Sequence, residues 1–146
     1  MMLPFARLFP ELAAAETRTA TLAPLRPGDP PDFPPGDEYA FFEHYCADRK
    51  CDCRRVLIYV YARYADKHVA TISHAFDPPP PGARIRQQTF LDPILLQSQW
   101  SPALLDLFAH ELFSDQDYRQ RLRLHYRMFK SVVHNPFHPA HHKLRA

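Results

Sequence analysis

Three cysteines carry the clearest chemical signal in this sequence. Cys46, Cys51 and Cys53 lie within eight residues, and they are the only cysteines of the 146-residue chain. Zinc prefers thiolate and imidazole ligands, usually four of them in a tetrahedron. Charged neighbours such as Asp48 and Lys50 distinguish this segment from the apolar surroundings in which cysteine serves only as a small core residue. The spacing therefore predicts one Zn²⁺ ion held by the three thiolates, with metal-free packing cysteines as the alternative.

The fourth ligand is open to three interpretations. His125 lies on the apolar stripe of a predicted C-terminal helix and from there can reach the cysteine loop, although a histidine in such a place is often a hydrogen-bonded core residue. His44 is nearest in sequence, and water is the remaining option. We favour His125, which would make a closed and therefore structural site. A water ligand would instead allow a zinc-dependent hydrolase.

The patterns of known zinc enzymes are absent. His110-Glu111 begins an H-E-x-x-H pattern, but Ser114 stands where the second histidine is required. The histidine, glutamate and paired cysteines of the zinc deaminases are also missing. The sequence therefore predicts no catalytic residues, and it favours a binding module over an enzyme.

The elements around the cysteines are expected to position them. A helix is predicted over 38–45, because Phe41, Phe42 and Tyr45 would share one helical face. A strand over 55–64 has apolar residues on both faces, and a turn leads it into an antiparallel partner over 68–76. Residues 16–22 predict a short edge strand, and a proline-rich loop covers 24–35.

The C-terminal third is predicted to be helical. One helix begins at Ser101-Pro102, and a second begins within 114–117 and runs to about Val133. The fold class is therefore α+β, with a small antiparallel β-sheet packed against C-terminal helices. We expect a single domain over 1–146, with a folded core over 16–133 and a flexible histidine-rich tail over 134–146.

Composition limits the partners. The net charge is only +2, and acidic residues are spread among the basic ones, so a dedicated nucleic-acid binder is not favoured. Tyr59 and Tyr61 share a strand face with Arg55 and Arg63, which leaves base stacking as the alternative function, but we expect a helix to cover this face. The arginines of the last helix are interpreted as a solvated face.

The expected location is the cytoplasm. Pro4, Arg7 and Pro10 interrupt the N-terminal apolar residues, so the first residues do not read as a signal peptide. No apolar run approaches the length of a membrane span, which predicts no membrane partner. An odd number of clustered cysteines also favours reduced thiols over a disulfide framework.

Three blocks of this sequence resemble an uncharacterised family of bacterial proteins with a Y-C-x4-C-D-C-R motif. The matching blocks are Y-C-A-D-R-K-C-D-C-R-R-V at 45–56, L-D-P-I-L-L-Q-S at 91–98 and H-Y-R-M-F-K at 125–130. The resemblance implies a shared fold and a metal site, and it adds weight to His125, but it implies no reaction. Our leading hypothesis is a small zinc-binding interaction or adaptor module with an unidentified protein partner.

Overall fold

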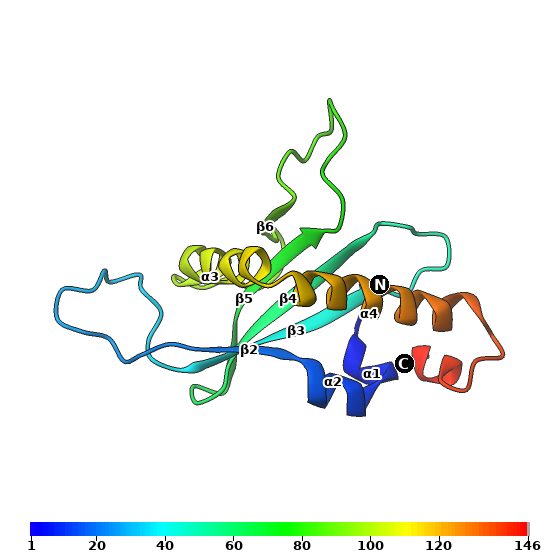
Figure 1. Ribbon diagram of the computed structural model, residues 1–146, viewed down its shortest axis with the longest axis horizontal. Helices are drawn as coiled ribbons and strands as arrows, with labels where there is room; N and C mark the ends of the chain where they lie inside the picture. Colours follow the sequence, from blue (N-terminus) through cyan, green and yellow to red (C-terminus); the bar gives the residue numbers. More distant parts are fainter. Residues whose placement is uncertain (146) are drawn as a thin grey trace.

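A six-stranded antiparallel sheet forms the centre of the protein, as the computed structural model shows for residues 1–145 (Figure 1). The strands are β1 (Met2–Pro4), β2 (Arg18–Thr21), β3 (Glu38–Cys46), β4 (Arg55–Ala62), β5 (Lys67–Ala75) and β6 (Thr89–Leu91). Their order is β1-β3-β4-β5-β6, and β2 pairs with β3 along the same edge as β1. The predicted fold class is confirmed, because this sheet packs against two C-terminal helices.

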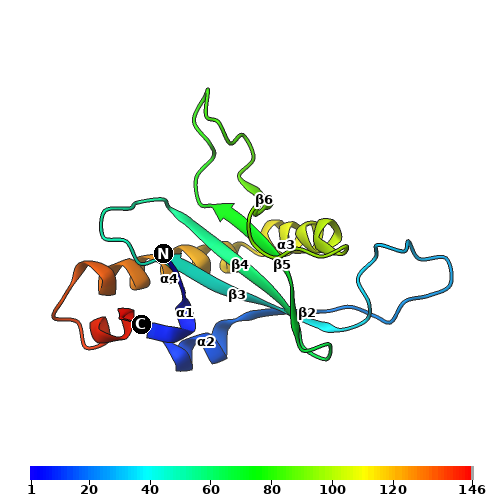
Figure 2. The same cartoon turned by 180° about the vertical axis from the view of Figure 1, so that it is seen from behind.

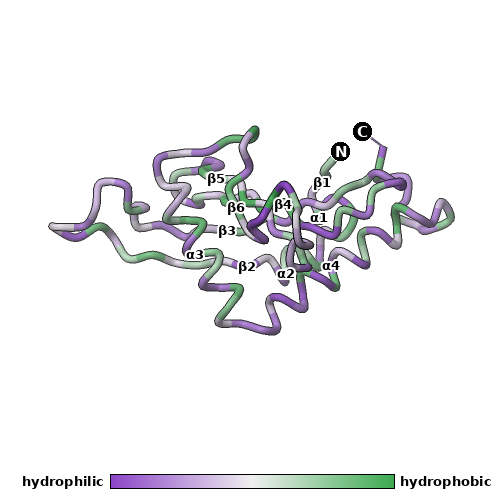
Figure 3. Tube along the Cα trace, turned by 90° about the horizontal axis from the view of Figure 1, so that it is seen from above, coloured by the Kyte–Doolittle hydropathy of each residue, from purple (hydrophilic) through white to green (hydrophobic). Residues whose placement is uncertain are grey.

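The helices lie mainly on one face of the sheet. They are α1 (Phe5–Leu8), α2 (Pro10–Glu16), α3 (Ser101–Ser114), α4 (Gln116–His134) and the short 3₁₀ helix η1 (His141–Leu144). Figures 1 and 2 show α3 and α4 following each other across the sheet, with α1 and α2 near its β1–β2 edge. In Figure 3, hydrophilic and hydrophobic residues alternate along the turns of these helices, as expected where one side of each helix is buried.

The core lies between α3, α4 and the facing side of the sheet. Phe41 of β3 packs edge-on against Phe108 of α3, with ring centroids 5.5 Å apart. Leu122 and Phe129 of α4 are fully buried, and so is Ile58 at the centre of β4. Burial of large apolar side chains contributes about 1.5–3 kcal/mol each, so the C-terminal helices are a principal source of the stability that holds β3 and β4 in place.

The prediction of a helix over 38–45 is wrong, because these residues form β3. Tyr39, Phe41 and Tyr45 alternate along the strand and point into the core, whereas Phe42 points to the opposite face and is 40% exposed. The spacing of the aromatic residues is compatible with a helical face as well as with strand alternation. Antiparallel pairing with β4 on one side and with β1 and β2 on the other decides in favour of the strand.

The remaining local predictions agree with the structure more closely. β4 and β5 form the predicted antiparallel hairpin, whose turn contains Asp66 at a positive φ of 54°. Asp115 caps α4 by accepting a hydrogen bond from the backbone N–H of Tyr118 at 3.2 Å. Two long loops, over residues 22–37 and 76–88, project away from the sheet in Figure 1. No helix among the described residues is long and apolar enough to cross a membrane.

The C-terminal residues lie against the N-terminal helix α1, and the flexibility expected from residue 134 onward stays a prediction. The guanidinium of Arg7 donates hydrogen bonds to the backbone carbonyls of Lys143 and Arg145, each at 2.6 Å. His141 also donates from Nδ1 to the carbonyl of Val132 at 2.8 Å. Contacts to α1 and α4 hold this segment, and proline content and charge alone do not predict them. Residue 146 lies outside the described residues.

Candidate metal centre

The cysteines lie where β3 ends and β4 begins. Cys46 is the last residue of β3, and Cys51 and Cys53 follow in the loop over 47–54. Arg54 then adopts a left-handed backbone conformation with φ of 50°, which turns the chain into β4. Such a conformation costs a residue other than glycine about 1–2 kcal/mol, and the backbone hydrogen bonds around Arg54 hold it in place.

The three sulfur atoms converge. The Sγ atoms of Cys46, Cys51 and Cys53 all lie within 4.8 Å of one another, and all three cysteines are free thiols. Zn–S bonds of about 2.3 Å in a tetrahedron place sulfur atoms roughly 3.8 Å apart. The three sulfur atoms are therefore close enough for one ion to bind them after at most a small adjustment of the side chains. The arrangement predicted from spacing is present, although the identity of a metal does not follow from it.

Two residues of α4 anchor the cysteine loop. The ammonium of Lys130 donates hydrogen bonds to the backbone carbonyls of Cys46 at 3.1 Å and Asp48 at 3.0 Å. The hydroxyl of Tyr126 donates to the carboxylate of Asp52 at 2.8 Å and accepts from the backbone N–H of Arg54 at 3.3 Å. The loop is thus held at both ends, and a buried positive charge lies beside a group of thiols.

The pKa values of the Cys51 and Cys53 thiols shift in opposite directions. Burial raises the pKa of the Cys53 thiol to about 11, and its hydrogen bond with Cys51 adds to this effect. Burial also acts to raise the pKa of Cys51, but hydrogen bonds from Cys46 and Cys53 and the charge of Lys130 outweigh it and lower that pKa. Hydrogen bonding thus stabilises one thiolate within the cluster, and a bound cation would favour loss of the other protons as well.

The structure does not bring His125 to the cysteines. Its Nδ1 donates to the carboxylate of Glu43 at 2.7 Å, and its Nε2 donates to that of Glu16 at 3.0 Å. The ring of Phe5 stacks on the imidazole with centroids 4.1 Å apart, and the His125 side chain is fully buried. Both ring nitrogens therefore have carboxylate partners. This agrees with the alternative that His125 is a hydrogen-bonded core residue, although its partners are side chains and not backbone groups.

A carboxylate–histidine–carboxylate cluster, made of Glu16, Glu43 and His125, lies in the core, and its two carboxylates favour the protonated form of the imidazole. Burial alone would lower the pKa of His125, but the hydrogen bonds and charges of Glu43 and Glu16 outweigh it and raise the pKa. The hydroxyl of Tyr45 donates a further hydrogen bond to Glu43 at 2.7 Å. An imidazolium donating to two carboxylates satisfies all its hydrogen-bonding capacity.

His44, the other histidine considered as a ligand, lies on the sheet face opposite the C-terminal helices. Its ring stacks on Tyr59 with centroids 3.8 Å apart, and Tyr59 stacks in turn on His68 at 4.6 Å. Tyr61 extends this aromatic face and packs against Phe42. The face was expected to lie under a helix, but α3 and α4 pack on the other side, and Tyr59 and Tyr61 remain partly exposed.

Another buried histidine, His74 on β5, should make stability fall in mild acid. Burial, with the charges of Arg123 and Arg55, lowers its pKa to about 4, whereas an unfolded histidine titrates near 6.5. Between these values the unfolded chain binds more protons, so this contribution to stability is present above pH 6.5 and is lost as pH falls toward 4. From pH 7 to pH 5 we expect a loss of about 2 kcal/mol from this group alone.

Replacing His74 tests this expectation. His74→Gln removes the titration but keeps a polar group near the Thr89 hydroxyl, which lies 2.8 Å from His74 Nδ1. Urea unfolding at pH 7 and pH 5 should show a smaller acid-induced loss in the variant than in the wild type, whereas His134→Gln, at an exposed position, should leave the loss unchanged. An identical loss in the His74→Gln variant would contradict the assignment.

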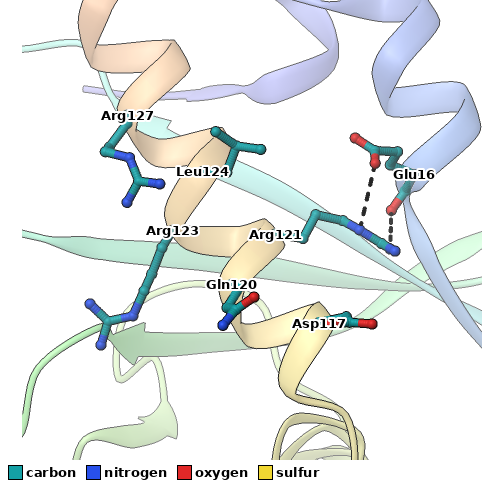
Figure 4. A pocket seen from close by; sticks show the side chains of 7 residues that line it. All are labelled: Glu16, Asp117, Gln120, Arg121, Arg123, Leu124 and Arg127. Atoms are coloured by element: carbon teal, nitrogen blue, oxygen red, sulfur yellow. Dashed lines mark hydrogen bonds and ion pairs between the residues drawn. The ribbon is translucent and has the colours of Figure 1, made fainter.

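The arginines of α4 are not a uniformly solvated face. A pocket of about 560 Å³ lies along this helix. Figure 4 shows the side chains that line it, which include Arg121, Arg123 and Arg127. Arg121 bonds the backbone carbonyl of Glu16 at 3.1 Å, and Arg123 lies 3.7 Å from the carboxylate of Asp77. Lys130, which the sequence places in the same series, is buried beneath the cysteine loop. The basic residues therefore tie α4 to α2, to the 76–88 loop and to the candidate metal centre.

Sequence reasoning missed the residues that support both clusters. Lys130 and Tyr126 lie one helical turn apart on α4, and that spacing was available in the sequence, but nothing local indicates that they face the cysteine loop. Glu43 stands among the aromatic residues of β3, where a carboxylate at a core-facing position is itself a signal of a buried partner.

No protein-family model, no curated protein and no solved structure matches this chain.

Proposed function

We propose that this protein is a small zinc-binding domain in which the ion fixes the loop between β3 and β4. The observation that carries the proposal is the convergence of the Cys46, Cys51 and Cys53 sulfur atoms within 4.8 Å. Three thiols brought together by a short, anchored loop form a soft-ligand site. Such sites select zinc, copper(I) or iron–sulfur clusters over hard cations, and zinc is the one that commonly stabilises small loops.

The surroundings favour a cation bound by several thiolates. Three thiolates around Zn²⁺ leave one net negative charge, and the ammonium of Lys130 lies close enough to offset it. The guanidinium of Arg54, although paired with Asp77, adds a positive charge at the same end of the sheet. An uncompensated negative cluster partly buried in the protein would be costly, so these cations support a site built for thiolates.

The proposed biological role is that of an interaction module. Zinc would join the end of β3 to the start of β4, which leaves other surfaces for a protein partner. An exposed apolar run over 94–96 supports this role, since Ile94 is 89% exposed and Leu96 is 51% exposed on the loop after β6. Adjacent exposed apolar side chains are typical of protein interaction sites.

Metal content measured by native mass spectrometry tests the proposal. Protein purified without an affinity tag should carry one zinc per chain, and Cys51→Ser should abolish or strongly reduce this occupancy because it removes one of three thiolates. His142→Ala is the matched control, since it changes an exposed histidine of η1 and should leave occupancy at one. A wild-type protein that contains no metal after growth with zinc would refute the proposed function.

A further inference from the structure

A groove, called the open-face groove below, lies on the sheet face opposite α3 and α4, between α2 and strands β3 and β4. Its larger part has a volume of about 440 Å³. Small and aromatic side chains form most of the lining, and they include Pro10, Ala13, Ala14, Ala40, Phe42 and Tyr61. An apolar lining with aromatic rings is typical of sites that bind small organic molecules.

A smaller part, of about 200 Å³, continues the open-face groove to the edge of β3. The two parts adjoin, because they share the lining residues Ala6, Ala13, Thr17 and Phe42. Strand β2 pairs with residues 38–41 of β3 and β1 pairs with residues 44–46, so Phe42 and Glu43 lie between the two pairings. Glu43 lines the smaller part of the groove at this place. The groove thus leads from the open face of the sheet to a carboxylate of the core.

One carboxylate oxygen of Glu43 has no hydrogen-bond partner among the described residues. The Tyr45 hydroxyl and His125 Nδ1 both donate to Oε1, each at 2.7 Å, and neither bonds Oε2. Within the described chain, the Tyr118 hydroxyl is the only fully enclosed side-chain polar atom that lacks a partner. Oε2 is therefore not fully enclosed, although the Glu43 side chain is only 3% exposed. The accessible space that Glu43 lines is the smaller part of the open-face groove.

This free oxygen selects a positively charged donor. A carboxylate oxygen only accepts hydrogen bonds, and it binds a charged N–H more strongly than a neutral one. None of the described residues that line the smaller part is a lysine or an arginine. His44 lines it, but burial lowers the pKa of His44 to about 4, so this imidazole is neutral at neutral pH. The aromatic ring of Phe42 belongs to the same wall, and such rings attract cations.

We propose that the open-face groove binds a small organic amine, whose protonated nitrogen bonds Oε2 of Glu43 and whose apolar body lies against Phe42 and Tyr61. The ammonium supplies the donor that Oε2 lacks, and the apolar body displaces water from the alanine-lined part of the groove. Arg63 and Glu38 line the larger part, but they pair with each other at 3.1 Å. No residue of the cysteine loop lines either part, so this ligand site does not require the metal ion.

Isothermal titration calorimetry with 2-phenylethylamine tests the proposal. The neutral 2-phenylethanol, which has nearly the same size and shape, is the matched control ligand. At neutral pH we expect saturable binding of the amine, with an affinity roughly tenfold or more above that of the alcohol. Glu43→Gln keeps an acceptor for Tyr45 and His125 but removes the negative charge, so it should abolish the preference for the amine.

A second pair of variants tests the groove without changing the carboxylate. Ala14 is exposed on α2 and lines the groove, so Ala14→Trp fills the groove from the surface and should weaken amine binding roughly tenfold or more. Ala15→Trp is the matched control, since Ala15 is exposed on the same helix but lines neither part, and it should bind the amine like the wild type.

Three results would each overturn the proposal. The first is a wild-type protein that shows no saturable binding of the amine, or binds the amine and the alcohol equally. The second is a Glu43→Gln variant that keeps the preference for the amine. The third is unchanged amine binding by Ala14→Trp, and this result and the comparison of the two ligands still decide the matter if Glu43→Gln does not fold.

Discussion

If the proposed zinc ion is bound, its removal by a chelator is expected to lower the melting temperature of this protein by roughly 8–16 °C. A ligand that binds only the folded state at a free concentration 1,000 times its Kd stabilises that state by about 4 kcal/mol. For a domain of this size each kcal/mol shifts the melting temperature by roughly 2–4 °C. The loss should be large because Cys46 and Cys53 belong to the two ends of the β3–β4 connection, whose strands form the centre of the sheet.

Differential scanning calorimetry with and without a chelator measures this effect. Cys51→Ser should melt near the temperature of the chelated wild type, and chelation should change it little further. His142→Ala should respond to chelation like the wild type, because His142 is not among the proposed ligands. A wild-type protein that keeps its full melting temperature after complete removal of the metal would show that the site has no structural role.

Substitution of His125 by leucine is expected to destabilise the fold by about 3–5 kcal/mol. The substitution leaves the carboxylate of Glu43 buried, with a side chain only 3% exposed, and removes the imidazole that donates a hydrogen bond to it. It also removes the stack on Phe5 and the hydrogen bond to Glu16, which ties α2 to α4. Urea unfolding monitored by circular dichroism measures the change in the free energy of unfolding.

Two further variants assign the cause of this loss. His110→Leu replaces an exposed histidine on α3 and should change stability by no more than about 0.5 kcal/mol. The double variant His125→Leu with Glu43→Leu should recover part of the loss, because no unpaired charge remains in the core. Metal content should stay at one ion in His125→Leu. Loss of zinc from that variant with little change in apo-protein stability would instead identify His125 as a ligand.

Local sequence signals predicted elements whose periodicity is unambiguous. The continuous apolar run of β4 predicted a central strand, which is found, although the face of Tyr59 and Tyr61 is partly exposed and not covered by a helix as expected. Pro102 and Asp115 indicated where α3 and α4 begin. β3 was predicted wrongly because its aromatic residues satisfy both a helical and an alternating pattern. The competition between the two is resolved by backbone hydrogen bonds to strands β1, β2 and β4, and those bonds are not local.

The cysteine cluster could be predicted from the local sequence, whereas the cluster around His125 could not. The three cysteines were predicted to converge because they lie within one segment of eight residues, and the antiparallel pairing of β3 with β4 brings the two ends of that segment together. The partners of His125 were not predictable, since Glu43 is 82 residues away and Glu16 is 109 residues away. Lys130, 84 residues from the Cys46 carbonyl that it bonds, is a similar case. Chain connectivity determines short-range geometry, whereas the packing of α4 across the sheet decides which distant side chains meet.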